Sequence, residues 1–160
     1  MHYGFPSLPG TYALILTLAA PAELPIGKLG SFTFPLGEYV YTGSAHGPGG
    51  LRARLRHHLR PVQRPHWHID YLRTQAVVSG GVYVVQGDFS VGSMPLECGW
   101  SQALLALPGA CVPAAGFGAS DCCSGCPAHL VHFVETGNIV AQLRAVTDEK
   151  IVLWRNVLNV

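Results

Sequence analysis

The stretch YVYTGSAHGPGGLRARLRHHL, from Tyr39 to Leu59, decides the fold expected for this 160-residue chain. Its first part, Glu38 to Gly43, is apolar and aromatic and predicts a strand. A glycine-rich loop from Ser44 to Gly50 leads into three leucines spaced four residues apart, which predict a helix over Leu51 to Leu59. Pro61 ends that helix. The stretch therefore predicts a strand that turns directly into an amphipathic helix.

A helical wheel divides the polar residues of this helix between two flanks. Arg54 and His58 fall on one side of the leucine stripe, and Arg52, Arg56 and Arg60 fall on the other side. If the leucines pack on a sheet, Arg54 and His58 border that contact, whereas the three-arginine row faces outward. An outward row is either an ordinary solvated face or a surface for an anionic partner.

The region around the helix is basic although the whole protein is nearly neutral. Between Glu38 and Asp70 there is no acidic residue, yet this region holds five of the ten lysines and arginines, while the formal net charge of the chain is +1. A local patch can still attract phosphates. We therefore predict that Arg52, Arg56, Arg60 and Arg64 bind nucleic acid.

The rest of the chain alternates strand-like and helix-like segments. Strands are predicted at 11–18, 31–34, 76–86 and 129–135, helices at 66–73 and 95–107, a hairpin partner at 139–146, and a strand or helix at 148–158. The chain is 49% apolar and 12% charged, which predicts one folded domain over residues 1–160. We see no basic leader and no apolar run long enough to span a bilayer, so we expect a cytoplasmic protein with no membrane partner and with reduced cysteines.

Five short motifs together resemble a known family of nucleases. They are GTY and YTG at residues 10–12 and 41–43, the arginine helix after YVYTGSA, and the segments HWHIDYL (66–72) and GASDCCSGCPAHL (118–130). In their order and spacing they resemble the GIY-YIG nuclease superfamily, and in particular a divergent branch that is sometimes fused to endonuclease III. The resemblance covers about residues 9–135, and the tail 136–160 extends it.

The resemblance implies an α/β (α+β) domain, with a small, mainly antiparallel sheet flanked by helices. It also implies an endonuclease that hydrolyses DNA or RNA with one divalent ion, Mg²⁺ or Mn²⁺, in a role such as DNA repair. The implied catalytic residues are Tyr12, Tyr41, Arg54 and His58. Arg54 would neutralise the phosphate, and a tyrosine whose pKa is lowered by nearby cations would deprotonate the attacking water.

The metal ligand and the function both leave alternatives open. Glu97, on the helix after the third long strand, is the expected ligand, and Asp70 is the rival ligand; Asp70 could instead accept a hydrogen bond from a neighbouring arginine. Ser44 stands where many superfamily members carry a lysine, which favours a non-catalytic nucleic-acid-binding module on the same fold. The two tyrosines, Arg54 and Glu97 favour the nuclease.

The cysteines suggest a further metal. Cys123, Cys126 and His129 have ligand-like spacing, with Cys122 adjacent, and Cys122, Cys111 or Cys98 could supply a fourth zinc ligand. The competing interpretation is a set of buried thiols or an incidental disulfide. A zinc-stabilised interaction domain with an incidental basic helix is the third functional class that this sequence allows.

Overall fold

The computed structural model describes residues 3–86, 94–134, 139–145 and 150–157. Its elements are β1 (Gly10–Leu18), β2 (Ala22–Pro25), the 3₁₀ helix η1 (Gly27–Leu29), β3 (Ser31–Phe34), β4 (Gly37–Ala45), α1 (Gly50–Leu59), α2 (His68–Arg73), β5 (Val77–Val85), α3 (Leu96–Leu105), β6 (Ala110–Cys111), β7 (Leu130–Phe133), α4 (Ile139–Ala145) and β8 (Val152–Arg155). Six strands form one antiparallel sheet in the order β6-β7-β4-β1-β5-β8, and β2 pairs with β3 in a separate hairpin. The predicted α+β class is confirmed.

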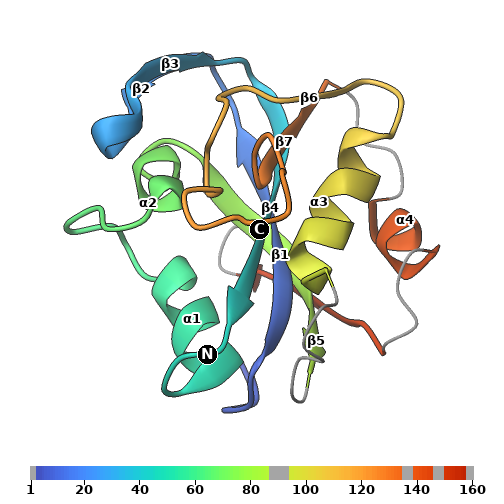
Figure 1. Cartoon of the computed structure of the whole chain (residues 1–160). Helices are drawn as coiled ribbons and strands as arrows, with labels where there is room; N and C mark the ends of the chain where they lie inside the picture. The colour runs from blue at the N-terminus through green and yellow to red at the C-terminus, as the bar shows by residue number, and fades with distance from the viewer. Residues whose placement is uncertain (1–2, 87–93, 135–138, 146–149, 158–160) are drawn as a thin grey trace.

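The helices cover both faces of the sheet. In Figure 1, α1 and α2 lie on one side, and α3 and α4 lie on the other. The side chains of β1 alternate between a hydrophobic core on one face of the sheet and a second core on the other face, because successive strand side chains point to opposite faces. Tyr12, Leu14 and Leu16 belong to the core under α1 and α2, whereas Ala13 belongs to the core that Trp100 of α3 fills.

Helix α1 forms as its leucine spacing predicts. Leu51 and Leu55 are completely buried against the central strands, and Pro61 follows the helix end. Gly49 precedes α1 with φ +82°, a left-handed conformation that glycine adopts without steric cost. The outcome is a helix docked across the middle of the sheet, so Arg54 and His58 border the central strands β1 and β4 and not an edge of the sheet.

Several predicted segments differ from the structure. Residues 139–145 form the helix α4 and not a hairpin partner, because the buried Ile139 and Leu143 lie one helical turn apart and pack beside α3. In the tail, β8 is a strand that pairs with β5. The short strands β2 and β6 lie in segments for which no strand was predicted. Val146 and the outer residues of the predicted tail segment lie outside the described residues.

The sheet leaves an opening at one end of β4. Strand β7 pairs only with residues 38–41 of β4, and the Thr42 N–H donates to the carbonyl of His129, just before β7 begins. Beyond this point β4 continues to Ala45, paired on its other side with β1. The segment between β6 and β7 crosses this region between α2 and α3 (Figure 1). Residues from both helical layers therefore meet there.

Candidate active site

An open cleft with a volume of about 790 Å³ lies at this end of β4. Its lining includes Tyr12 and Tyr41 from the sheet, Arg54 from α1, Trp67 beside α2, and Glu97 from α3. The segment before β7 adds residues 120–124 and His129. The four residues that the resemblance marks most strongly (Tyr12, Tyr41, Arg54 and Glu97) thus face one cavity although they are up to 85 positions apart in the sequence.

Tyr12, Tyr41 and His58 form a buried cluster at the base of the cleft. The Tyr12 hydroxyl lies 2.9 Å from His58 Nε2, and the ring centroids of Tyr12 and Tyr41 are 6.5 Å apart. Gly43 makes this contact possible, because a Cβ at that position would lie 2.5 Å from the Tyr12 hydroxyl oxygen. His58 Nδ1 has no hydrogen-bond partner among the residues that the structure describes. His58 is therefore an internal partner of Tyr12.

The protonation of this cluster differs from the expectation. Burial raises the pKa of Tyr12 well above its ordinary value, and burial followed by the charge of Glu97 does the same for Tyr41. Arg54 lowers both values, but its effect is smaller than that of burial. Burial also holds the pKa of His58 well below its ordinary value, so its imidazole is neutral at neutral pH. The prediction of a lowered tyrosine pKa is wrong for this structure.

Arg54 is held at the cleft by an aromatic partner. Its Cζ lies 4.3 Å from the centroid of the Trp67 ring, a cation–π arrangement. Within the described parts of the chain no carboxylate forms an ion pair with Arg54, so its charge faces the cleft without neutralisation. Trp67 was not among the residues predicted to form the site. The contact between Trp67 and Arg54 joins residues at two different helices, so the spacing of residues within either helix could not predict it.

Glu97 lies in the first turn of α3 with a partly exposed carboxylate. Oε1 accepts a hydrogen bond from Ser44 Oγ at 3.1 Å, and Oε2 lies 3.8 Å from His129 Nδ1. Ser44, at the position where many GIY-YIG members carry a lysine, thus contacts this carboxylate directly. Carboxylate and hydroxyl oxygens are hard ligands of the kind that Mg²⁺ and Mn²⁺ prefer.

Asp70 lies outside the cleft lining and is almost completely buried. It accepts hydrogen bonds from the backbone N–H groups of His66 and Trp67, and Arg73 Nη1 donates to Oδ1 at 3.0 Å. His57 Nε2 lies 3.0 Å from the same oxygen. Although His57, His58 and Asp70 approach closely enough to share an ion, Arg73 already occupies the carboxylate. The arrangement matches the interpretation of Asp70 as an arginine's hydrogen-bond partner.

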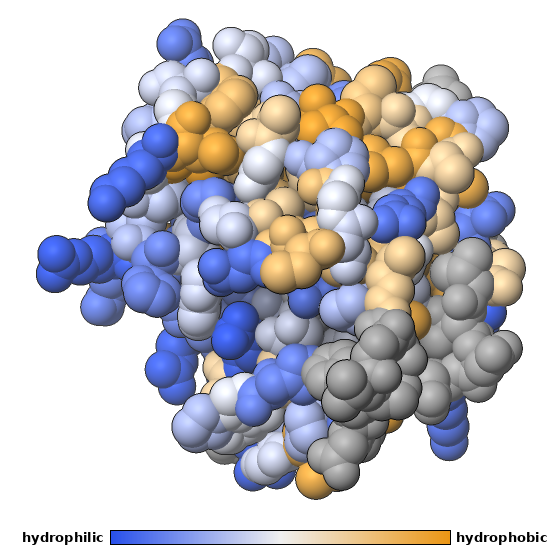
Figure 2. Space-filling model, viewed as in Figure 1, coloured by the Kyte–Doolittle hydropathy of each residue, from blue (hydrophilic) through white to orange (hydrophobic). Residues whose placement is uncertain are grey.

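The four arginines predicted to bind nucleic acid lie on the surface of the molecule. Arg52, Arg56, Arg60 and Arg64 are all exposed. Hydrophilic side chains gather over α1 and the segment that follows it, on the left of Figure 2. One of the four has an internal contact, since Arg52 Nε donates to the carbonyl of Phe5 at 2.8 Å. The guanidinium groups remain accessible to an anionic partner.

Three cysteines and a histidine meet beside the cleft, with one change from the predicted set. The group consists of Cys98, Cys122, Cys126 and His129. Cys123 is exposed and donates from Sγ to the carbonyl of Asp121, so its predicted place as a zinc ligand is wrong. Burial raises the pKa of the Cys122 thiol, but hydrogen bonds from the N–H groups of Ser124 and Cys126, together with those of His129 and Cys98, outweigh burial and bring the pKa to about 6.

The fold and the site together define a small α+β domain with an open cleft, lined by charged and aromatic side chains, beside a cysteine–histidine cluster. The chain belongs to the family described as Domain of unknown function DUF123, which it matches over residues 11–152. The comparisons with curated proteins and with solved structures found no match. Within the described residues, no helix has the length and apolar character needed to cross a membrane.

Proposed function

We propose that this protein is a metal-dependent phosphodiesterase that cleaves DNA or RNA, an endonuclease of the GIY-YIG type. The observation that carries the proposal is the shared cleft of Tyr12, Tyr41, Arg54 and Glu97. These residues come from four elements, β1, β4, α1 and α3, and only the resemblance predicts that they meet. A cleft with an unneutralised arginine at one side and a carboxylate at the other suits a phosphodiester together with a divalent ion.

Glu97 and Ser44 are the residues that would hold the ion. A partly exposed carboxylate with an adjacent hydroxyl suits Mg²⁺ or Mn²⁺, which keep several waters and bind few protein oxygens. When bound, the ion would supply Lewis-acid polarisation of the phosphate and a more acidic water. Arg54 would bind a phosphate oxygen from the opposite side of the cleft, while Trp67 fixes the position of its guanidinium group.

Tyr12 and His58 would move the proton of the attacking water as a pair. Because burial keeps the phenol of Tyr12 protonated, Tyr12 accepts a proton only when it passes its own proton onward. His58 is the base within reach, with Nε2 at 2.9 Å from the hydroxyl. Because burial lowers its pKa, His58 is a weak base, so the relay requires a water that the divalent ion has made more acidic. The water would give a proton to the Tyr12 oxygen as the Tyr12 proton moves to His58. This proton relay takes the place of the expected mechanism, in which nearby cations would ionise a tyrosine and the tyrosinate would act as the base.

A binding module without catalysis is the second candidate, and the contacts of Glu97 favour it. Both carboxylate oxygens already have polar neighbours, Ser44 and His129, and Ser44 replaces a cationic residue. Such a module would bind nucleic acid through the exposed arginines and leave it intact. Binding of DNA or RNA without metal-dependent cleavage would therefore replace the nuclease proposal with this one.

Cleavage assays on the full chain test the nuclease proposal. Single- and double-stranded DNA and RNA are incubated with Mg²⁺ or Mn²⁺, and with EDTA as the metal-free control. Arg54→Ala is expected to lower the cleavage rate about 100-fold, as expected for loss of a group that stabilises transition-state charge. Arg155→Ala, a matched loss of an exposed arginine on β8, should leave the rate unchanged. Equal rates for the wild type and Arg54→Ala would contradict the proposed role.

The outer arginines predict the salt dependence of binding. Replacing Arg52, Arg56 and Arg60 with alanine should weaken binding of DNA and RNA. It should also lower the slope of log K against log salt by about 0.9 for each lost phosphate contact on duplex DNA. Fluorescence anisotropy at several salt concentrations measures this slope. The triple alanine variant at Lys28, Lys150 and Arg155 removes the same charge elsewhere and should retain most of the slope.

A further inference from the structure

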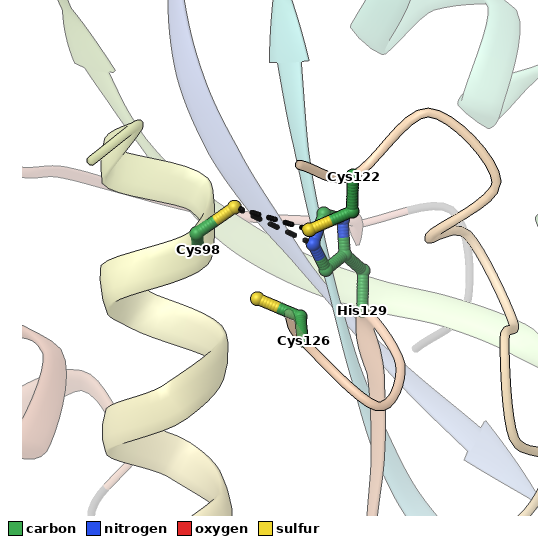
Figure 3. A group of neighbouring side chains, drawn as sticks. All are labelled: Cys98, Cys122, Cys126 and His129. Atoms are coloured by element: carbon green, nitrogen blue, oxygen red, sulfur yellow. Dashed lines mark hydrogen bonds between the residues drawn. The ribbon is translucent and has the colours of Figure 1, made fainter. Parts of the chain in front are cut away.

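The cysteine–histidine cluster has no part in the proposed phosphodiester chemistry. Its members come from two parts of the fold: Cys98 lies in the first turn of α3, and Cys122, Cys126 and His129 lie in the segment before β7. Figure 3 shows the four side chains pointing toward one common centre. We propose that these four residues hold one structural zinc ion that fastens the cleft-lining segment to α3.

The distances suit ligands around a single ion. Cys98 Sγ lies 3.7 Å from Cys122 Sγ and 3.7 Å from His129 Nε2, and all four ligand atoms lie within 4.8 Å of one another. A tetrahedral zinc with Zn–S bonds of about 2.3 Å separates neighbouring ligand atoms by about 3.8 Å. A disulfide requires about 2.05 Å between sulfurs, so the Cys98–Cys122 pair is not bonded. The cluster therefore has the dimensions of a Cys₃His site.

The chain around the cluster directs N–H groups toward two of the cysteine sulfurs, which favours their thiolate form. Cys122 and Cys126 are four positions apart in the segment, and Gly125 between them takes φ +74°, a left-handed conformation that favours glycine. Backbone N–H groups of Ser124 and Cys126 face the Cys122 sulfur, and Gln102 Nε2 donates to Cys126 Sγ at 3.6 Å. N–H donors directed at sulfur stabilise a negative charge there. Such donors are common around metal-bound thiolates.

Glu97 would support the histidine ligand from the second coordination shell. With Nε2 on zinc, the neutral imidazole of His129 carries its proton on Nδ1, and this nitrogen lies 3.8 Å from Glu97 Oε2. At this distance the carboxylate attracts the Nδ1–H group electrostatically, and a small side-chain rotation to about 3.0 Å would form the hydrogen bond that fixes the tautomer of a ligating histidine. Glu97 also directly precedes Cys98 on α3. One carboxylate would thereby connect the zinc site to the proposed divalent-ion site in the cleft.

Four protein ligands leave no open position, which marks a structural zinc and not a catalytic one. The segment from 112 to 129 has no helix or strand of its own, yet it provides part of the cleft lining. Cys98 and His129 are buried, while Cys122 and Cys126 are half-buried. A zinc ion here would hold this irregular segment against α3 and would keep one wall of the cleft in place.

Metal analysis of the full chain tests the proposal without any nucleic acid. The chain is purified without a metal-binding tag, incubated with Zn²⁺, freed of excess ion, and measured for zinc by mass spectrometry. We expect one zinc per chain, and Cys98→Ser and Cys126→Ser should each lose most of it. The matched controls Cys111→Ser and Cys123→Ser replace exposed cysteines outside the cluster and should keep it.

Thiol labelling provides a second readout that does not depend on the variants folding. In the zinc-loaded wild type, only the two exposed cysteines, Cys111 and Cys123, should react rapidly with a thiol reagent. All five cysteines should react after denaturation with a chelator. Wild-type protein with far less than one zinc per chain, or five rapidly reacting thiols after zinc loading, would overturn the proposal. Failure of the nuclease assay would leave these readouts unaffected.

Discussion

Replacing Glu97 with glutamine is expected to lower the rate of Mg²⁺-dependent cleavage about 1,000-fold, because loss of a metal ligand removes about 4 kcal/mol of transition-state stabilisation. Glutamine has nearly the same shape and can still accept a hydrogen bond from Ser44 Oγ. It lacks the negative charge that attracts a hard divalent cation. The loss should therefore come from chemistry and not from unfolding.

Single-turnover cleavage over a range of Mg²⁺ concentrations measures this effect. If Glu97 holds the ion, Glu97→Asp should recover part of the rate, and higher Mg²⁺ should partly rescue Glu97→Gln. Glu23→Gln, an exposed carboxylate on β2, is the matched control and should cleave like the wild type. Wild-type cleavage by Glu97→Gln at low Mg²⁺ would exclude Glu97 as the ligand.

The zinc content of the same preparation separates the two roles of Glu97. Loss of a carboxylate behind a ligating histidine lowers metal affinity about 10- to 100-fold, which a tight zinc site tolerates when zinc is saturating. A Glu97→Gln protein that keeps its zinc but loses cleavage would locate the defect in the cleft. A protein that loses both would show that Glu97 acts through His129.

The elements with strong local patterns were predicted from the sequence. The apolar run of β1 and the leucine spacing of α1 agree with the structure to within one residue. The segment 139–145 was assigned incorrectly because Ile and Val favour strands locally, whereas contact with α3 selects the helix. The strand β2 contains only four residues and ends at a proline, so its pairing with β3 had no sequence signal.

The sequence predicted several residues that line the cleft, but it did not predict how deeply they are buried or how burial changes their pKa values. The helical wheel predicts that Arg54 and His58 share one flank of α1, and in the structure both lie near Trp67. The depth of the tyrosines was not predictable, because burial depends on how α1 and the segment before β7 cover β1 and β4. That depth reverses the direction of the tyrosine pKa shift. Likewise Cys98 joins the cluster only because α3 turns toward His129.

Replacing Asp70 with alanine is expected to destabilise the fold by about 3–5 kcal/mol, the usual cost of removing one partner of a buried ion pair. The carboxylate is 1% exposed and the Arg73 side chain is 6% exposed, so the guanidinium would stay buried without its partner. The N–H groups of His66 and Trp67 would also lose their acceptor at the start of α2. Urea unfolding followed by tryptophan fluorescence measures the change, and Asp121→Ala is the exposed control.

The dependence of stability on pH provides an independent measure of the same carboxylate. Burial raises the pKa of Asp70, but hydrogen bonds from His66, Trp67 and His57 outweigh burial and leave it below the ordinary value. Because the folded pKa is lowered, the contribution to stability is fully present above the unfolded value of about 4 and is lost as pH falls below it. The difference between wild type and Asp70→Ala should therefore be large at pH 7 and shrink as the medium is acidified toward pH 3. A difference that stays constant across this range would show that alanine acts through lost packing. In that case the buried charge pair would not be the source of stability.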